Sequence, residues 1–466
     1  MSREMMEQRE QRNASINSAE SRKNKSEAQM KNSGIEWIGE IPKEWEERKF
    51  GNICSVVTDF VASGSFADLR QNVTYLDYPD YAMLVRTTDL ANSIRSEKRV
   101  YISKESYDFL QNSNLHGGEV VLPNIGSIGD VYIVPSDLYP KMSLAPNAIM
   151  FKTQLCDKYY FYYFLSKIGN LQLQEISQST AMDKFNKTDL KSLRVICPPL
   201  SEQQKIANYL DKVCGEVDEM IALQKQMIEE LKAYKQSVIT EAVTKGLNPD
   251  VPMKDSGIDW IGEVPKHWGT PAISYVAAIS SGSTPDRNNP LFWKNGDINW
   301  IKTGELQNNR ISESEEKVTE HALNNTSLKL YPKNTILIAM YGQGKTRGMT
   351  ALLDVPCTTN QACAALSVRN DNLCCEYLWK CLMGAYDAIR EKAVGTGQPN
   401  LNSELISKFV ITLPPINEQK EIVNYIDEII PQIDALIAIK QAKIEELKEY
   451  KKSVIYEYVT GKKEVV

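Results

Sequence analysis

The chain has 466 residues, of which 42% are hydrophobic and 24% are charged, and its formal net charge is −6. This is the composition of a folded globular protein of two to four domains, at roughly 100–200 residues per domain. The negative charge argues against a general polyanion binder, which is usually basic, although charge can be segregated along a chain. The sequence has no run of about 18 apolar residues, so we expect no membrane span.

Cysteine and histidine usage argues against a metal site. The nine cysteines form no Cys-x-x-Cys pair, and the three histidines (His116, His267 and His321) share no motif. We therefore expect reduced thiols, as in a cytoplasmic protein, and no zinc site, disulfide framework or catalytic set. Residues 1–29 are polar and mixed in charge, which predicts a disordered tail and not a secretion signal.

Two segments of the chain recur in the same order. Residues 30–45 read MKNSGIEWIGEIPKEW and residues 253–268 read MKDSGIDWIGEVPKHW. Residues 198–246 and 414–461 both begin with Pro-Pro and end with Val-Thr and a glycine, at an offset of 216 (414 against 198). A period above about 200 residues indicates two duplicated halves, not a solenoid of short repeats.

The second repeated segment has the apolar spacing of a helix. From Ile206 and from Ile422 onwards, hydrophobic residues step by three and four, which places them on one stripe. Gly215 in one copy and Pro431 in the other are helix breakers. We predict a short helix that ends there and a longer one of about 28 residues, or roughly 42 Å, that begins there. Two such helices are expected to pair as an antiparallel coiled coil; the alternative is that each packs only on its own half.

The segments between the repeats contain short β-rich runs, such as YAMLVRT and TILIAMYG, with one or two helical stretches. This pattern predicts compact α+β domains with an antiparallel or mixed sheet. The predicted fold is α+β: two similar mixed α/β domains separated by two long helices packed as an antiparallel coiled coil, with pseudo-twofold symmetry. The expected segments are the tail 1–29, a first block 30–200, a helical region 201–250, a second block 251–415 and a second helical region 416–466.

The first repeated segment carries the pattern W-x-G-x-[IV]-P-x-x-W. It places Trp37 and Trp45 in one copy and Trp260 and Trp268 in the other. Because both copies retain the tryptophans, we interpret them as an apolar clasp that holds the start of each block to its helix. Stacking on nucleic-acid bases is the alternative.

Three sets of loops are candidates for binding. YGQGKT (341–346) is similar to the end of a phosphate-binding loop, but Ala339 stands where the first glycine is required and β-like residues follow. We therefore favour a glycine-rich loop from which Lys345 and Arg347 project, with a nucleotide-binding enzyme as the alternative. VRTTDL (85–90) matches IKTGEL (301–306), and STAMDKFN (179–186) matches GTGQPNLN (395–402).

Taken together, these motifs resemble the specificity subunit of type I restriction-modification enzymes. The resemblance covers residues 33–461 and is carried by IPKEW and VPKHW, by PPLSEQQKIANYLD and PPINEQKEIVNYID, and by AMYGQGKTRG and TTNQACAAL. In the first block, LPNIGSIGD and LAPNAIMF are only loosely similar to the usual forms.

The resemblance implies a cytoplasmic, non-catalytic subunit that reads double-stranded DNA. Each block would be a target recognition domain for one half of an asymmetric, bipartite site. The helices would act as a spacer and bind two methyltransferase subunits, and restriction subunits would complete the complex. It implies no cofactor on this chain, since S-adenosylmethionine and ATP with Mg²⁺ would belong to the partner subunits. A coiled-coil interaction scaffold without DNA specificity is the alternative.

The matched loops supply the candidate residues for DNA contact, and the helices supply those for partner contact. Arg and Lys suit guanine or phosphate, and Asn and Gln suit adenine. The candidates for DNA contact are Arg86, Thr87, Lys184, Asn186, Lys302, Thr303, Lys345, Arg347, Gln398 and Asn400. The candidates for the helical spacer and partner contact are Glu202, Gln203, Tyr209, Leu231, Tyr234, Glu418, Gln419, Tyr425, Leu447 and Tyr450.

The net charge is concentrated in the helical regions. Residues 201–250 hold 6 basic and 9 acidic residues, and residues 416–466 hold 8 and 10. The second block is neutral, with 16 of each sign. The acidity that argued against DNA therefore belongs to the expected partner-binding helices, and the blocks retain local cations for selective contacts.

Overall fold

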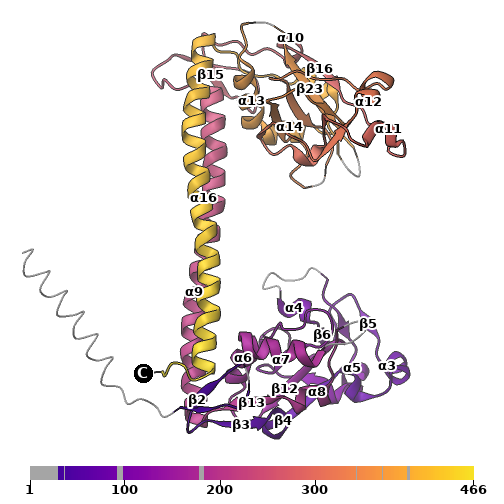
Figure 1. Cartoon of the computed structure of the whole chain (residues 1–466), viewed down its shortest axis with the longest axis vertical. Coiled ribbons are helices and arrows are strands. Elements are labelled where there is room, and N and C mark those ends of the chain that lie inside the picture. The colour runs from indigo at the N-terminus through magenta and orange to yellow at the C-terminus, as the bar shows by residue number, and fades with distance from the viewer. Residues whose placement is uncertain are drawn as a thin grey trace, which may run out of the picture. The chain divides into compact units, whose positions relative to one another are not determined.

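The computed structural model describes residues 30–35, 37–91, 98–177, 183–342, 344–369, 371–395 and 399–465. The predicted tail 1–29 lies outside these residues. The chain divides into two compact units: unit 1 is Met1–Ala222 with Ile444–Val466, and unit 2 is Leu223–Lys443. Each unit therefore combines one block with the start of one long helix and the end of the other (Figure 1). No helix in the described ranges is long and apolar enough to cross a membrane.

The block of unit 1 is built on two main sheets. A four-stranded antiparallel sheet has the order β10-β9-β12-β4, and a five-stranded sheet has the order β5-β7-β6-β11-β8 with β11 parallel to β6. The first sheet is made by β4 (Cys54–Asp59), β9 (Val120–Pro123), β10 (Tyr132–Ile133) and β12 (Ala148–Thr153). The second is made by β5 (Tyr75–Leu76), β6 (Ala82–Val85), β7 (Tyr101–Ile102), β8 (Asn114–Leu115) and β11 (Met142–Leu144).

Two short strand pairs and a set of helices complete this block. The pairs are β1 (Met30–Asn32) with β2 (Glu40–Pro42), and β3 (Glu46–Lys49) with β13 (Arg194–Cys197). The helices are α2 (Phe50–Ile53), η1 (Phe60–Ser63), α3 (Phe66–Asn72), α4 (Thr87–Ala91), α5 (Lys104–Phe109), η2 (Gln111–Ser113), α6 (Asp157–Leu165), α7 (Lys167–Ser177) and α8 (Lys187–Ser192).

Unit 2 has a five-stranded sheet in the order β16-β23-β20-β21-β18 and a three-stranded sheet in the order β19-β17-β22. The strands are β14 (Met253–Asp255), β15 (Glu263–Pro265), β16 (Ala277–Ser281), β17 (Ile298–Ile301), β18 (Asn309–Ile311), β19 (Glu316–Val318), β20 (Ile336–Ala339), β21 (Thr350–Leu353), β22 (Thr358–Thr359) and β23 (Cys363–Val368). The helices are α10 (Ile273–Val276), α11 (Pro290–Trp293), η3 (Thr303–Glu305), α12 (Glu320–Asn325), α13 (Cys375–Gly384), α14 (Tyr386–Glu391) and α15 (Ser403–Lys408). The mixed sheets with flanking helices confirm the predicted α+β class.

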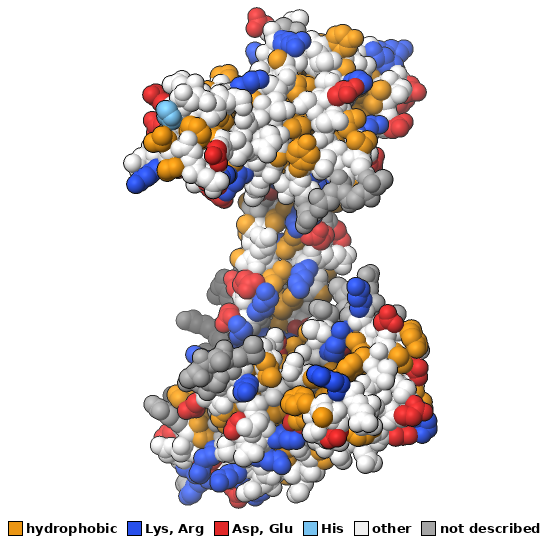
Figure 2. Space-filling model, turned by 90° about the vertical axis from the view of Figure 1, so that its right-hand side faces the viewer, with side chains coloured by type: hydrophobic (Ala, Val, Ile, Leu, Met, Phe, Trp, Pro, Cys, Tyr) orange, Lys and Arg blue, Asp and Glu red, His pale blue; other side chains and the backbone are white. Residues whose placement is uncertain are grey.

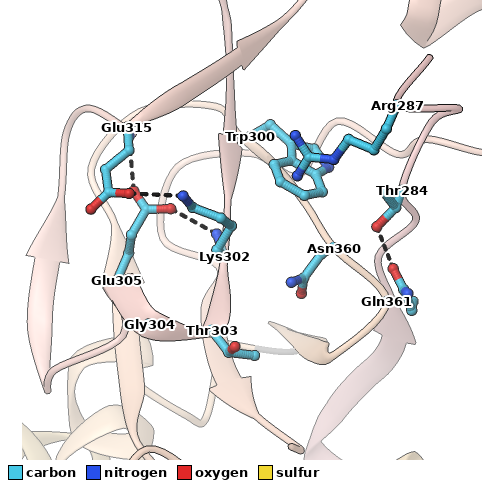
Figure 3. A pocket seen from close by; sticks show the side chains of 10 residues that line it. All are labelled: Thr284, Arg287, Trp300, Lys302, Thr303, Gly304, Glu305, Glu315, Asn360 and Gln361. Atoms are coloured by element: carbon cyan, nitrogen blue, oxygen red, sulfur yellow. Dashed lines mark hydrogen bonds and ion pairs between the residues drawn. The ribbon is translucent and has the colours of Figure 1, made fainter. Parts of the chain in front are cut away.

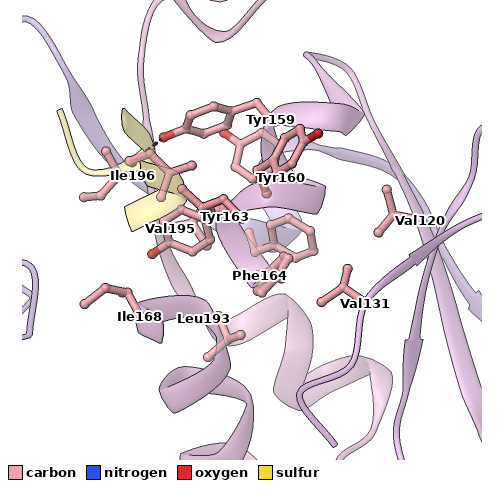
Figure 4. Close-up of a cluster of buried hydrophobic side chains, with 14 of the residues drawn as sticks. Val120, Val131, Tyr159, Tyr160, Tyr163, Phe164, Ile168, Leu193, Val195 and Ile196 are labelled. Carbon is pink, nitrogen blue, oxygen red and sulfur yellow. Dashed lines mark hydrogen bonds between the residues drawn. The ribbon is translucent and has the colours of Figure 1, made fainter. Parts of the chain in front are cut away.

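Aromatic side chains of α6 fill the core of unit 1 (Figure 4). Tyr159, Tyr160, Tyr163 and Phe164 are buried among apolar residues of the sheet and of α7 and β13. The Tyr159 hydroxyl donates to the carbonyl of Val459, 2.9 Å away at the last residue of a long helix. Burial raises the pKa of Tyr159 well above its ordinary value, so this hydroxyl remains a neutral donor. The core thus binds a helix end as well as a sheet.

The two long helices are continuous. They are α9 (Leu200–Lys245) and α16 (Ile416–Val459), and Pro431 lies inside α16. The breaks predicted at Gly215 and Pro431 are therefore wrong, and so is the length of about 28 residues. A proline inside a helix costs roughly 3 kcal/mol and a glycine about 1 kcal/mol. Burial of the apolar stripe, which includes Ile426 and Ile433, offsets this cost.

The helices pair with each other in an antiparallel sense. In unit 1, the Tyr209 and Tyr458 rings lie 4.5 Å apart, and Lys451 binds Asp218 at 2.7 Å. In unit 2, Lys235 binds Asp434 at 2.7 Å. The second ion pair is the image of the first at the repeat offset of 216, with the helices exchanged. The predicted antiparallel pairing is confirmed within each unit, and the matched ion pairs show that the contact itself is repeated.

In unit 1, Trp45 joins the block to both long helices. Its ring is only 1% exposed, and its indole Nε1 donates to Glu202 Oε2 at 2.8 Å, in the first turn of α9. Gly461, just past the end of α16, has a φ of 69° and approaches the same ring so closely that a Cβ would lie 3.1 Å from it. Burial raises the pKa of Glu202, and the indole N–H partly offsets this effect.

Unit 2 repeats this arrangement with the helices exchanged. Trp268 is 1% exposed and its Nε1 donates to Glu418 Oε2 at 2.9 Å, in the first turn of α16. Gly246, at the end of α9, has a φ of 77°, and a Cβ there would lie 3.0 Å from the indole. The predicted tryptophan clasp is confirmed for Trp45 and Trp268. Trp260 instead stacks on Phe409 at 5.6 Å, and Trp37 is 43% exposed.

The clasp can be tested by removing its donor. In Trp45→Phe the Glu202 carboxylate loses its indole partner in a partly buried site, so we expect the free energy of unfolding to fall by about 1–3 kcal/mol. Chemical denaturation followed by circular dichroism measures this loss. Trp37→Phe is the control, because that ring is largely exposed; equal losses in the two variants would contradict a specific role for the Trp45–Glu202 bond.

Candidate nucleic-acid interface

The first pair of matched loops lies at equivalent strand ends in the two units. Arg86 follows β6 and Lys302 follows β17. Their backbone N–H groups donate to carboxylates three residues later, at 3.0 Å for Asp89 and 2.7 Å for Glu305. This shared geometry confirms that the register between the blocks persists here, where the sequences have diverged.

The charges of these two candidates are already neutralised inside their own units. The Arg86 guanidinium binds both oxygens of Asp89, at 2.9 and 2.7 Å, and this bond raises the pKa of Arg86. Lys302 Nζ lies 2.8 Å from Glu315 and 3.0 Å from Glu316, whose carboxylates raise its pKa. Thr87 and Thr303 begin the short helices that follow.

Lys302 and Thr303 line an open pocket of about 530 Å³ in unit 2 (Figure 3). The other walls come from η3, from the segment before α11 and from the end of β22. The full lining is Thr284, Arg287, Trp300, Lys302, Thr303, Gly304, Glu305, Glu315, Asn360 and Gln361. The Arg287 guanidinium lies over the Trp300 ring at this pocket and holds the pKa of Glu316 below its ordinary value.

The glycine-rich loop of unit 2 connects β20 to β21. Lys345 at its tip is exposed, whereas the Arg347 guanidinium donates to the carbonyl of Pro399. A phosphate-binding loop requires a helix after the Lys-Thr pair so that the helix N-terminus faces the phosphate. Here strand β21 follows instead, which removes the structural basis for the nucleotide-binding alternative.

Two side chains of α14 hold this loop in place. Arg390 donates to the carbonyl of Arg347 at 2.7 Å and to that of Gly344 at 2.8 Å. The Tyr386 hydroxyl donates to the carbonyl of Lys345 at 2.6 Å. Because three carbonyls of the loop are bonded from one helix, the backbone on both sides of Lys345 is held in place.

Unit 1 has the same clamp with different residues. Asn170 of α7 donates to the carbonyl of Gly129 at 2.9 Å, and Gln174 donates to Asn170 at 2.8 Å. Asn170 and Gln174 stand 216 residues before Tyr386 and Arg390. Loop and helix are therefore joined in both units although none of the four side chains is shared.

The second pair of matched loops lies against these glycine loops. In unit 1, Lys184 is exposed and its backbone bridges to Ile125, while the Asn186 side chain caps α8. In unit 2, Asn400 exchanges backbone hydrogen bonds with Val394 at 2.9 and 3.1 Å. Gln398 lies outside the described residues. The glycine-rich loop and the second matched loop thus form one loop cluster in each unit, with Asn186 used as a helix cap.

Three of the helix candidates present apolar surface. Tyr234 and Tyr450, which are equivalent at the offset of 216, are 56% and 53% exposed, and Tyr425 is 37% exposed. Leu447 is buried and Leu231 partly buried. The Tyr209 ring contacts the Tyr458 ring, and Glu202 and Glu418 accept the tryptophan N–H bonds, so these residues have roles inside the chain.

The two glutamines predicted for partner contact are fully buried. Gln203 donates to the carbonyl of Pro198 and accepts from the Cys156 N–H, at 2.8 and 3.2 Å. Gln419 donates to the carbonyl of Pro414 and accepts from the Cys374 N–H, at 2.8 and 2.7 Å. Both side chains fasten a helix start to its own block, so the prediction of partner contact is corrected for them.

Basic side chains form no continuous patch on the visible surface. Figure 2 shows Lys and Arg interspersed with Asp and Glu over both blocks. All nine cysteines are free, and within the described ranges no group of three or more His, Cys, Asp or Glu is placed to hold a metal ion.

Sequence reasoning missed Arg287, Tyr386 and Arg390. Arg287 had one usable signal, a cation close to Trp293 and Trp300 in the second block alone. Tyr386 and Arg390 had none, because their counterparts in the first block differ in type and only the backbone contacts are shared.

Comparison with known proteins agrees with this geometry. The family model of the type I restriction modification DNA specificity domain matches residues 42–233 and 265–449. The chain therefore belongs to this family and carries its domain twice. Among curated relatives, the EcoR124I/EcoR124II specificity subunit of Escherichia coli is 26% identical over 279 residues, which are 58% of this chain and 62% of that protein. The MjaIX specificity subunit of Methanocaldococcus jannaschii is 23% identical over 394 residues, 81% of this chain and 85% of that protein.

Solved structures share the fold. A chain from a solved structure on complex assembly and conformational transition of the type I R-M system aligns with this chain with a TM-score of 0.67. It covers 90% of this chain and 98% of its own, at 16% identity. The HsdS subunit from Thermoanaerobacter tengcongensis aligns over the same shares with a TM-score of 0.50, also at 16% identity.

The loop clamp predicts a measurable change in local stability. Arg390→Gln removes the donors that reach Gly344 and Arg347, so hydrogen exchange of the backbone amides at residues 344–349 is expected to rise by about tenfold, as for loss of roughly 1.4 kcal/mol. Lys392→Gln is the control, because Lys392 follows the same helix without bonding the loop. Unchanged exchange in the Arg390 variant would contradict the clamp.

Proposed function

We propose that the chain is the non-catalytic DNA-recognition subunit of a type I restriction-modification complex, and that it reads an asymmetric, bipartite site in double-stranded DNA. Each block reads one half of the site. The family membership and the names of its relatives support the class of complex, and the two loop clusters support one reading surface in each block.

One observation supports the asymmetry most directly. The two long helices and the tryptophan clasp, called the frame below, make matched contacts in the two units, as in the Trp45–Glu202 and Trp268–Glu418 bonds. The candidate reading surfaces do not repeat: Leu84 stands where the second block has Trp300 in its pocket wall. Two different readers on a repeated frame select two different half-sites, whereas a symmetric dimer selects a palindrome.

The helices supply docking surface for partner subunits. Exposed apolar side chains recur at matched positions on α9 and α16, namely Met220 with Leu436, Leu223 with Ile439, and Tyr234 with Tyr450. Exposed apolar residues of this kind are typical of interaction sites. Two methyltransferase subunits dock here, restriction subunits join the same complex, and S-adenosylmethionine, ATP and Mg²⁺ act on those partners in the cytoplasm.

Near-neutral blocks bind DNA weakly without help. Most sequence-independent affinity for DNA comes from neutralised phosphates, and Arg86 and Lys302 are already paired with carboxylates of their own unit. The partner subunits therefore contribute most phosphate contacts. The alternative, a scaffold without DNA specificity, predicts no selection of sequence by the assembled complex.

An exchange of the second block tests the proposal. Residues 251–415 are replaced by the corresponding block of a relative with another specificity, and the modified sites are mapped with the assembled complex. We expect only one half-site to change, because the first block and the frame are retained. A change in both halves, or in neither, would exclude one reader per block.

Removal of the single positive charge of Lys345 provides a second test of the proposal. In Lys345→Ala, we expect weaker DNA binding with unchanged sequence preference, and a slope of log K against log salt that is smaller by about 1. Titrations of the complex at several salt concentrations measure this slope. Lys408→Ala, which removes a lysine paired with Glu404 at 2.6 Å, is the control; an equal effect of the two variants would argue against a contact by Lys345.

A further inference from the structure

We propose that Arg287 reads a guanine in the half-site of the second block, with Asn360 and Gln361 as additional hydrogen-bond donors at the same pocket. This inference rests on the proposed function and names the residues that would determine specificity in one block.

The Arg287 guanidinium lies against two indoles. Its guanidinium carbon lies 4.0 Å from the ring centroid of Trp293 and 4.5 Å from that of Trp300. The two rings meet edge to face at 5.1 Å. A cation over an aromatic face is stabilised by the ring quadrupole, and the planar guanidinium fits this position better than an ammonium group.

The indoles are themselves fixed to the segment that carries the arginine. Trp293 Nε1 donates to the carbonyl of Asp286, and Trp300 Nε1 donates to that of Ser283, each at 3.0 Å. On its other side, Arg287 binds Glu316. The guanidinium is therefore oriented before any ligand arrives, while the side chain as a whole remains 47% exposed.

The carboxylates around the pocket bind groups of their own unit. Glu305 accepts the N–H groups of Lys302 and Glu315, at 2.7 and 3.0 Å, and Glu315 binds Lys302 Nζ. These bonds direct Glu305 and Glu315 toward groups of the same unit and keep Lys302 paired.

Donors, by contrast, are left over at the pocket wall. Asn360 uses its oxygen to accept the N–H of Ala362 at 3.1 Å, and Gln361 uses its oxygen to accept from Thr284. The amide nitrogens of both residues have no partner among the described residues. In Figure 3, Asn360 lies between the Arg287–Trp300 pair and Thr303.

A surplus of donors selects a base edge with two acceptors. In the major groove only guanine presents two adjacent acceptors, N7 and O6, and a paired arginine fork is the commonest contact to them. Cytosine presents a donor, adenine presents one donor and one acceptor, and thymine presents one acceptor beside a methyl group. The indoles hold the Arg287 guanidinium in place, and its remaining N–H groups can donate to the two acceptors of guanine.

The place of this feature in the fold agrees with a role in specificity. The clasp tryptophans occur in both units and pack the frame, whereas the Trp293–Arg287–Trp300 stack belongs to the second block alone. Residues that distinguish two half-sites must differ between the two blocks, and this stack meets that condition.

Sequence selection by the assembled complex tests the inference. The full chain, co-purified with the methyltransferase subunits of its own host, is allowed to select from a random duplex DNA library. We expect the wild-type complex to require dG at one position of the second half-site. Arg287→Ala is expected to reduce the preference for dG there by roughly tenfold to a hundredfold and to leave the first half-site unchanged.

Arg310→Ala is the matched control. Arg310 lies in the same unit, 5.7 Å from the ring centroid of Trp379, is paired with Asp354 at 3.0 Å and is 41% exposed, but it does not line the pocket. We expect this variant to keep the wild-type preference at every position. Asn360→Asp keeps the oxygen that accepts from Ala362 and loses the donor, so it should weaken the same dG preference as Arg287→Ala, which separates base reading from a change in folding.

Arg287→Lys keeps the charge and loses the fork, so it distinguishes base reading from phosphate contact. Loss of dG preference in this variant supports the inference; retention of the full preference overturns it. A second half-site without a required dG, or an Arg287→Ala complex that binds all sequences more weakly with unchanged preference, also overturns it. A wild-type complex that selects no sequence overturns the proposed function as well.

Discussion

An indole N–H that donates to a carboxylate in the first turn of a long helix is the contact on which the rest of this structure depends. Trp45 makes it to Glu202 and Trp268 makes it to Glu418. Each ring also contacts the glycine just past the end of the other long helix. A helix start, a helix end and a block are thereby joined at one buried side chain, and this happens once in each unit.

The tryptophan clasp belongs to the part of the structure that is the same in both units, whereas the loops of the blocks differ between the units. The helix ends are further fixed by Tyr159 and Tyr377, whose hydroxyls donate to the carbonyls of Val459 and Val243. The loops of the blocks are held by different side chains in the two units. Asn170 bonds the glycine loop in unit 1, and Tyr386 bonds it in unit 2. A frame of this kind accepts a new reading surface without a change in the way the blocks are held.

Much of the frame could be predicted from the sequence, because its residues are repeated. The apolar stripe predicted the helix pair, and the retained tryptophans predicted the clasp. The continuity of α16 through Pro431 could not be predicted. Helix propensity gives the cost of a proline inside a helix but does not include the burial of apolar side chains that offsets this cost. For the candidate interface, the sequence predicted Lys302, Lys345 and the loops that carry them. It contained no signal for Arg390, because a clamp depends on contacts between elements distant in the chain, and for Arg287 it contained only the nearby tryptophans.

The central claim is that one repeated frame presents two different readers, and the sequence of the modified DNA tests it most directly. Methylated adenines are mapped in host DNA with and without this chain. The account predicts that the methylation dependent on the chain occurs at a split, asymmetric sequence with two unlike halves and a gap of constant length. Methylation at a palindromic or uninterrupted sequence, or no methylation that depends on the chain, would contradict it.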